Sequence, residues 1–247
     1  NYDKAAQPRS GELERRHRQG LAMHQRHPAQ HQNGDAGEDH SDEHDGIAQQ
    51  AGVALTIAAA DVTGHAMKAA IPMVMFSDFL ENQMESPREL SDLFSSLNRS
   101  LYRSLDRRTF VCFVMVELSL SSRRLRFTDG GYPFPLHFHA STGTVTELVS
   151  VNYPLGVRPE SEFKVLETQL EPGDRVVLCS DGIMESQNQA QEPFGFERTA
   201  DTVRDGCNQG LSAEAILELL LGTVREYEGS ATQEQDDQTI VVLAIEA

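Results

Sequence analysis

Three aspartates of this chain stand at the ends of apolar, strand-like runs, where carboxylates can bind a metal ion. Asp61 ends one apolar run, Asp181 follows another, and Asp236 comes shortly before a third. Such carboxylates are fixed by a sheet yet project from its rim. A single aspartate there is more often a turn residue. Three that converge would repel one another strongly unless a cation lay among them.

Oxygen ligands of this kind determine which ion to expect. Carboxylates select hard divalent cations, so the pattern favours Mg²⁺ or Mn²⁺ over zinc or copper. Two such ions can activate water for in-line attack on phosphorus. If the three aspartates meet, the sequence therefore predicts metal-assisted hydrolysis of a phosphate ester.

Six short motifs surround these aspartates in a recognisable order. They are D-V-T-G-H (61–65), F-T-D-G-G-Y-P-F-P (127–135), Y-P-L-G-V (153–157), P-G-D (172–174) leading into S-D-G-I-M-E (180–185), F-G-F-E-R (194–198) and D-D-Q-T (236–239). Together they resemble the motifs of PPM-type serine/threonine protein phosphatases, in particular the SpoIIE/RsbU branch. The resemblance covers about Gly52 to Ala247.

The resemblance implies a fold and a set of site residues. The expected fold is α+β, a PPM-type four-layer sandwich of two antiparallel β-sheets flanked by helices. Asp61 would bridge two divalent cations, Mn²⁺ or Mg²⁺, and the Val62 carbonyl would bind one of them. Asp181 and Asp236 would complete the shell of the other ion. These three aspartates would be catalytic through the bound metals.

Three further residues of the motifs remain open to two interpretations. Asp237 and Glu185 are expected to support the turn and the loop rather than to bind metal. His65 could protonate the leaving serine oxygen. We favour a structural histidine at a helix N-terminus, because members of the branch often have lysine there.

The implied activity is hydrolysis of phosphoserine or phosphothreonine on a regulatory partner protein in bacterial signalling. By the same resemblance, the partner is a STAS-type anti-sigma-factor antagonist, and a sensor or receiver domain would lie upstream. The opening G-G-D-x-x-D motif of the family has no convincing copy; G-D-A-G-E-D (34–39) is the nearest. Ala66 and Tyr132 also replace the usual Gly and His. The alternative is therefore a catalytically impaired, phosphatase-like scaffold.

Periodicity predicts the elements that must position these motifs. Strands are expected from an apolar run or alternation bounded by turn residues, at 53–60, 110–118, 125–128, 136–139, 145–149, 163–170, 175–180 and 239–245. Helices are expected at 65–83, 86–105, 196–205 and 212–228. The second should start with Ser86 as N-cap and Glu89 closing a capping box. Grouped strands and paired helices indicate α+β layers.

Residues 1–50 differ from the rest in composition. They contain six of the nine histidines, and their few aliphatic residues show no period of 2 or 3.6. We expect a disordered or degenerate polar arm rich in His, Gln and Asp, with adventitious metal binding as the alternative. The phosphatase domain would then be residues 51–247.

The composition also excludes some partners and compartments. The net charge of −17, from 38 acidic and 21 basic residues, disfavours nucleic acid and anionic membranes. The sequence has no apolar run long enough for membrane insertion and no signal peptide. The odd, widely spaced cysteines are typical of free thiols in a reducing compartment. We expect a cytoplasmic protein.

Overall fold

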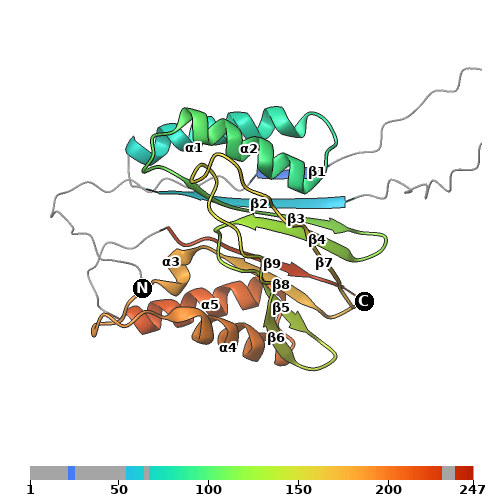
Figure 1. Cartoon of the computed structure of the whole chain (residues 1–247). Coiled ribbons are helices and arrows are strands. Elements are labelled where there is room, and N and C mark those ends of the chain that lie inside the picture. The colour runs from blue at the N-terminus through green and yellow to red at the C-terminus, as the bar shows by residue number, and fades with distance from the viewer. Residues whose placement is uncertain (1–21, 26–53, 64–66, 230–236, 247) are drawn as a thin grey trace, which may run out of the picture.

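The computed structural model describes residues 22–25, 54–63, 67–229 and 237–246. Two antiparallel sheets pack face to face, and helices cover the outer face of each (Figure 1). The expected four-layer α+β sandwich is confirmed. No helix in these described ranges combines the length and the apolar character that crossing a membrane requires.

The first sheet, sheet A, has the strand order β1-β2-β3-β4-β7. Its strands are β1 (Ala22–Gln25), β2 (Ala54–Val62), β3 (Val111–Ser119), β4 (Arg124–Gly130) and β7 (Leu166–Gln169). The long central pair β2 and β3 runs in register from Ala54 opposite Ser119 to Val62 opposite Val111. At nine residues each, these two strands are the longest in the sheet.

The second sheet, sheet B, has the strand order β6-β5-β8-β9. Its strands are β5 (Leu136–His139), β6 (Thr144–Glu147), β8 (Arg175–Cys179) and β9 (Ile240–Ala244). Alternate residues of β8 divide between two cores. Val176 and Leu178 face sheet A, whereas Val177 and Cys179 face the helices.

Five helices complete the layers within the described ranges. They are α1 (Met67–Met84), α2 (Leu90–Ser104), the short α3 (Asp181–Met184), α4 (Gly195–Asn208) and α5 (Ala213–Glu228). The pair α1 and α2 covers sheet A, and the pair α4 and α5 covers sheet B (Figure 1). The space between the two sheets is filled by apolar side chains from both sheets.

Aromatic residues anchor the α2 layer. Phe94 of α2 is fully buried and stacks on Phe113 of β3, with ring centroids 4.7 Å apart. Phe76 of α1 meets the same ring edge-on at 4.9 Å. One strand residue thus contacts both helices of this layer.

Two details differ from the sequence-based expectations. A short strand, β1, lies inside the segment expected to be a polar arm and pairs antiparallel with β2. The rest of residues 1–50 lies outside the described residues. The expected capping box is wrong, because α2 begins at Leu90, and its N-cap Glu89 makes no side-chain cap bond. The Glu89 carboxylate pairs instead with Arg126 of β4.

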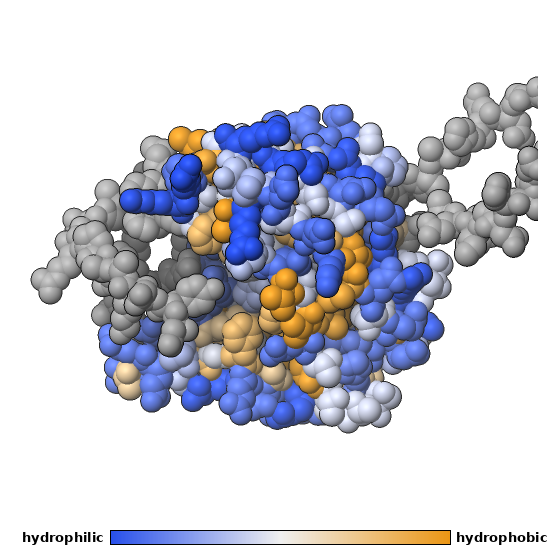
Figure 2. Space-filling model, in the orientation of Figure 1, coloured by the Kyte–Doolittle hydropathy of each residue, from blue (hydrophilic) through white to orange (hydrophobic). Residues whose placement is uncertain are grey.

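Most of the visible surface is hydrophilic, and apolar residues form patches within it (Figure 2). The loop after β6 contributes four large hydrophobic residues with exposed side chains, namely Val149, Val151, Tyr153 and Val157. All three cysteines are free thiols.

Candidate active site

Asp61 lies near the end of β2 on the face that looks toward sheet B. It continues the row of Ile57 and Ala59, both of which belong to the core between the sheets. Its partner across the ladder is Cys112 of β3. Just beyond it, the Thr63 hydroxyl accepts a 3.0 Å hydrogen bond from the Phe110 amide. This bond fixes the chain directly after Asp61.

Asp181 lies beyond the end of β8, as the first residue of α3. The preceding residue, Ser180, joins this turn to the D-D-Q-T segment. Its hydroxyl donates to the Asp237 carbonyl at 2.9 Å and accepts from the Thr239 amide at 2.9 Å. The Ser180 amide also donates to the Thr239 carbonyl at 2.9 Å. The two motifs that contain Asp181 and Asp237 therefore lie side by side.

The charges of Asp61, near the end of β2, and of Asp181, just after β8, act on the same two side chains. Burial is the main cause that raises the pKa of the Cys112 thiol to about 12, and the charges of Asp61, Asp181 and Asp129 contribute. Burial also raises the pKa of Tyr132, again with contributions from Asp181 and Asp61. Both aspartates therefore face the same buried thiol and phenol.

Asp129 adds a third carboxylate to this region. It lies in β4 opposite Val114 and is 1% exposed. Its Oδ1 accepts a 3.0 Å hydrogen bond from the Gly131 amide, whereas Oδ2 accepts none of normal geometry from the described residues. Burial raises the pKa of Asp129 to about 6, although hydrogen bonding from the Ser150 side chain and from the Gly131 amide acts in the opposite direction.

Asp129 was not among the residues singled out in the sequence, although it lies within the F-T-D-G-G-Y-P-F-P motif (127–135). Its strand, R-L-R-F-T-D-G, mixes polar and apolar residues, so the sequence pattern did not indicate that this carboxylate is buried.

Two further motifs meet beside this region. The Asn152 side chain donates to the Asp129 carbonyl at 3.0 Å. Gly131 has a φ of +81°, and a Cβ there would lie 2.5 Å from Pro154 Cγ. The D-G-G-Y-P turn and the Y-P-L-G-V loop are therefore packed so closely that only glycine fits at position 131.

The remaining residues singled out in the sequence have separate positions. Val62 ends β2 and is buried. Glu185 is exposed at the end of α3, and its amide donates to the Asp181 carbonyl at 2.7 Å. His65 and Asp236 lie outside the described residues.

The donor set suits a hard divalent cation. Asp61 and Asp181 place negative charge near a thiol and a phenol that burial keeps neutral, and Asp129 acts on the thiol as well. The buried Asp129 carboxylate interacts with Ser150 and with the Gly131 amide. A cation of the Mg²⁺ or Mn²⁺ type would relieve the repulsion and use oxygen ligands.

Comparisons with known proteins agree with this architecture. The family model described as stage II sporulation protein E (SpoIIE) matches residues 51–246. Phosphoserine phosphatase RsbU of Bacillus subtilis is 24% identical over 135 residues, which are 55% of this chain. The same match covers 40% of RsbU, so this chain spans less than half of that relative.

Solved structures share the fold. The SiaA-PP2C domain of Pseudomonas aeruginosa superposes with a TM-score of 0.67 at 22% identity, covering 79% of this chain and 77% of that chain. The PP2C phosphatase domain of SpoIIE from Bacillus subtilis, solved with a fragment of its regulatory domain, gives 0.60 at 22% identity, covering 76% and 54%. At such identities, the likeness shows the fold alone.

Proposed function

The chain belongs to the SpoIIE family, and on this premise we propose that it is a PPM-type phosphatase that hydrolyses phosphoserine or phosphothreonine on a partner protein. The catalytic domain would be residues 51–247. Asp61, Asp181 and Asp236 would hold two divalent cations, Mn²⁺ or Mg²⁺, with the Val62 carbonyl as a further ligand.

The observation that supports this proposal is that the charges of Asp61 and Asp181 act on the same two buried side chains, Cys112 and Tyr132. Asp61 lies at the end of β2 in sheet A, whereas Asp181 directly follows β8 of sheet B. Like charges held close together at the rim of the sandwich repel each other. A cation bound between them would replace this repulsion by attraction.

The bound ions and the side chains around them would have different roles. The bound ions would supply charge neutralisation and activation of water. Asp61 would hold the ions from the rigid end of β2, where Thr63 fixes the chain. Ser180 would hold the loop of Asp236 and Asp237 against the Asp181 turn, because it bonds to both Asp237 and Thr239. The buried thiol and phenol would stay neutral and keep bulk water out.

The partner is proposed on the resemblance to the SpoIIE/RsbU branch. That branch typically acts on phosphorylated STAS-type anti-sigma-factor antagonists, and its phosphatase domains often serve as outputs of sensor or receiver domains. The acidic surface of this chain, with a net charge of −17, favours a partner whose docking face is basic around the phosphorylated residue.

The test is phosphate release from a phosphoserine-bearing STAS-domain protein at saturating Mn²⁺. Asp61→Asn keeps the shape but removes a charge that would serve both ions, so turnover should fall at least about 100-fold, a barrier change of about 2.7 kcal/mol. Asp78→Asn, at an exposed position of α1, is the matched control and should keep wild-type turnover.

Circular dichroism should show the same fold in all three proteins, since the apolar strand before Asp61 is unchanged. A well-folded Asp61→Asn protein with wild-type turnover would contradict the proposed site. Wild-type protein that is inactive at every Mn²⁺ and Mg²⁺ concentration would contradict the proposed activity itself.

A further inference from the structure

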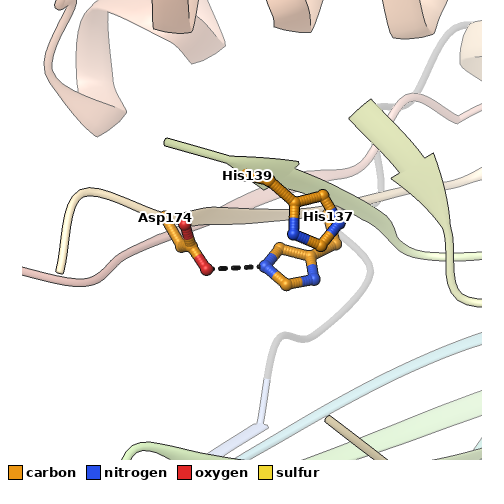
Figure 3. Close-up of side chains that lie close together, drawn as sticks. All are labelled: His137, His139 and Asp174. Carbon is orange, nitrogen blue, oxygen red and sulfur yellow. Dashed lines mark hydrogen bonds and ion pairs between the residues drawn. The ribbon is translucent and has the colours of Figure 1, made fainter. Parts of the chain in front are cut away.

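A second cluster of metal-ligating side chains lies at the opposite end of sheet B (Figure 3). It consists of His137, His139 and Asp174, and we call it the His-His-Asp cluster. One ligand atom from each residue lies within 4.8 Å of the others. We propose that this cluster binds a zinc ion, independently of the carboxylates at Asp61 and Asp181.

The sheet itself holds the three side chains together. His137 and His139 are alternate residues of β5 and so share one face; their ring centroids are 3.9 Å apart. His137 lies opposite Val176, which faces sheet A, so the histidines face the same way. Asp174 directly precedes β8 and continues the ladder beside the pair of Phe138 and Arg175. The cluster therefore needs no long loop to assemble.

The hydrogen bond of His137 shows which ring nitrogen faces the cluster. The residue is 1% exposed, and its Nε2 is 2.9 Å from Asp174 Oδ2. Its Nδ1 points away from Asp174 (Figure 3) and has no hydrogen-bond partner among the described residues. Nε2 and Oδ2 are therefore the two atoms that would bind the ion, which would take the place of the hydrogen bond between them.

Asp174 is itself held in place. Its Oδ1 accepts from the Ala140 amide at 2.9 Å, and its Oδ2 accepts from the Glu171 amide at 3.0 Å. These bonds orient the carboxylate toward β5 before any ion arrives. They also lower its pKa against the opposing effect of burial, so the carboxylate is charged. A charged carboxylate beside a buried imidazole is suited to a cation.

The ligand types favour zinc over magnesium. Two imidazoles and one carboxylate form a common zinc set, with metal–ligand distances of about 2.0–2.2 Å and a water in the fourth position. Ligand atoms of a tetrahedral ion are then roughly 3.3–3.5 Å apart, so small side-chain rotations would close the cluster. His139 is only partly buried, and its Nε2 lies 2.8 Å from Thr146 Oγ1. That side offers access for the ion and its water.

The two candidate metal sites lie far apart and offer different ligand atoms. Asp174 precedes β8 and Asp181 follows Ser180, so the five residues of β8 and Ser180 lie between them. Seven steps at about 3.3 Å per residue put the two aspartates roughly 23 Å apart. An oxygen-ligated site for Mg²⁺ or Mn²⁺ at one end and a nitrogen-containing site for zinc at the other could be filled at the same time.

The experiment compares zinc uptake by the full chain and by His139→Gln. Both proteins are stripped with a chelator and dialysed against micromolar Zn²⁺ in excess Mg²⁺, and the bound zinc is measured by elemental analysis. We expect the wild type to retain one more zinc ion per chain than His139→Gln. The six histidines within residues 1–50 are present in both proteins, so zinc that they bind cancels in the difference.

Asp61→Asn is the matched control and should retain the same extra zinc as the wild type. Replacing Zn²⁺ by Co²⁺ gives a second readout, because a four-coordinate nitrogen-containing site produces intense visible absorption bands that an octahedral oxygen site does not. Equal zinc content in wild type and His139→Gln would overturn the proposal. The absence of these bands in the wild-type protein would also overturn the proposal, and this measurement does not depend on the folding of any variant.

Discussion

The Ser180 hydroxyl and the Asp237 main-chain carbonyl are joined by a 2.9 Å hydrogen bond between segments 57 residues apart. The same hydroxyl accepts from the Thr239 amide, so one small side chain connects the Asp181 turn to the start of β9. Ser180 is buried, and its loss would leave main-chain groups without a partner.

We therefore expect Ser180→Ala to lower the free energy of unfolding by about 1–3 kcal/mol. The affinity for Mn²⁺ should fall as well, because the turn and the D-D-Q-T segment would lose their connection. Urea unfolding and an Mn²⁺ titration of activity measure the two effects. Ser77→Ala, at an exposed position of α1, should change neither. An unchanged Mn²⁺ affinity in Ser180→Ala would show that the serine is only structural.

Asp129 should make stability depend on pH. Its pKa is raised from 3.8 to about 6 in the folded protein, so folding favours the protonated form. This contribution is fully present below about pH 4 and is lost as the pH rises through about 6. The loss above pH 6 is about 3 kcal/mol, at 1.36 kcal/mol per pKa unit.

Asp129→Asn removes that titration. In EDTA, its free energy of unfolding relative to wild type should rise by up to about 3 kcal/mol between pH 4 and pH 7. Chemical denaturation at several pH values measures this slope. A difference between the two proteins that stays constant over the range would disprove the assignment. Asp78→Asn, an exposed control, should remain within about 0.5 kcal/mol of wild type throughout.

Two glycine substitutions should have opposite effects. Gly131→Ala places a Cβ 2.5 Å from Pro154 Cγ at a φ of +81°, so it should cost about 2 kcal/mol or more. Gly222 lies inside α5 with nothing within 4 Å of an added Cβ. Gly222→Ala should stabilise the protein by about 0.5–1 kcal/mol. Melting temperatures distinguish the two, and equal shifts would refute the packing argument.

Asn98 should hold the Y-P-L-G-V loop against α2. Its side chain accepts from the Gly156 amide at 2.9 Å and donates to the Arg158 carbonyl at 2.9 Å. The residue is 1% exposed. We expect Asn98→Ala to cost about 2–3 kcal/mol and to speed proteolysis of the loop. Asn82→Ala, which removes one exposed bond on α1, should cost far less. Equal losses in the two variants would contradict this role.

Most of the fold could be predicted from periodicity. The strand expected at 136–139 is β5 with the same bounds, and the helix expected at 212–228 is α5 within one residue. Their patterns are unambiguous because one face is apolar and the ends carry turn residues. The serine N-cap of α5 is one example: Ser212 accepts from the Ala215 amide. Local sequence and tertiary structure agree in these elements.

The buried face of α1 could not be predicted. Ile71 and Val74 are apolar, yet they are 62% and 69% exposed, whereas Phe76 is buried. The sequence M-K-A-A-I-P-M-V-M-F is apolar on nearly every side, so periodicity does not select a face. Contact with Phe113 selects it, and that contact comes from a strand far along the chain.

The candidate site was predictable to a smaller extent. Asp61 and Asp181 stand out in the sequence because each adjoins an apolar strand. Asp129 was missed because its role depends on burial beneath the loop that contains Asn152. Ser180 was likewise read only as part of a motif, since its partners Asp237 and Thr239 become neighbours only when β8 and β9 pair.

The strand pairings of both sheets also bear on how fast the chain can fold. Ala54 pairs with Ser119 and Cys179 with Ile240, so the central ladders join segments that are tens of residues apart. Forming such non-local contacts requires large loops to close, and this costs conformational entropy before the contacts stabilise the fold. We therefore expect folding on the millisecond-to-second scale. The helix pairs can form earlier. The aspartates should therefore come together late, as one of the final events of folding.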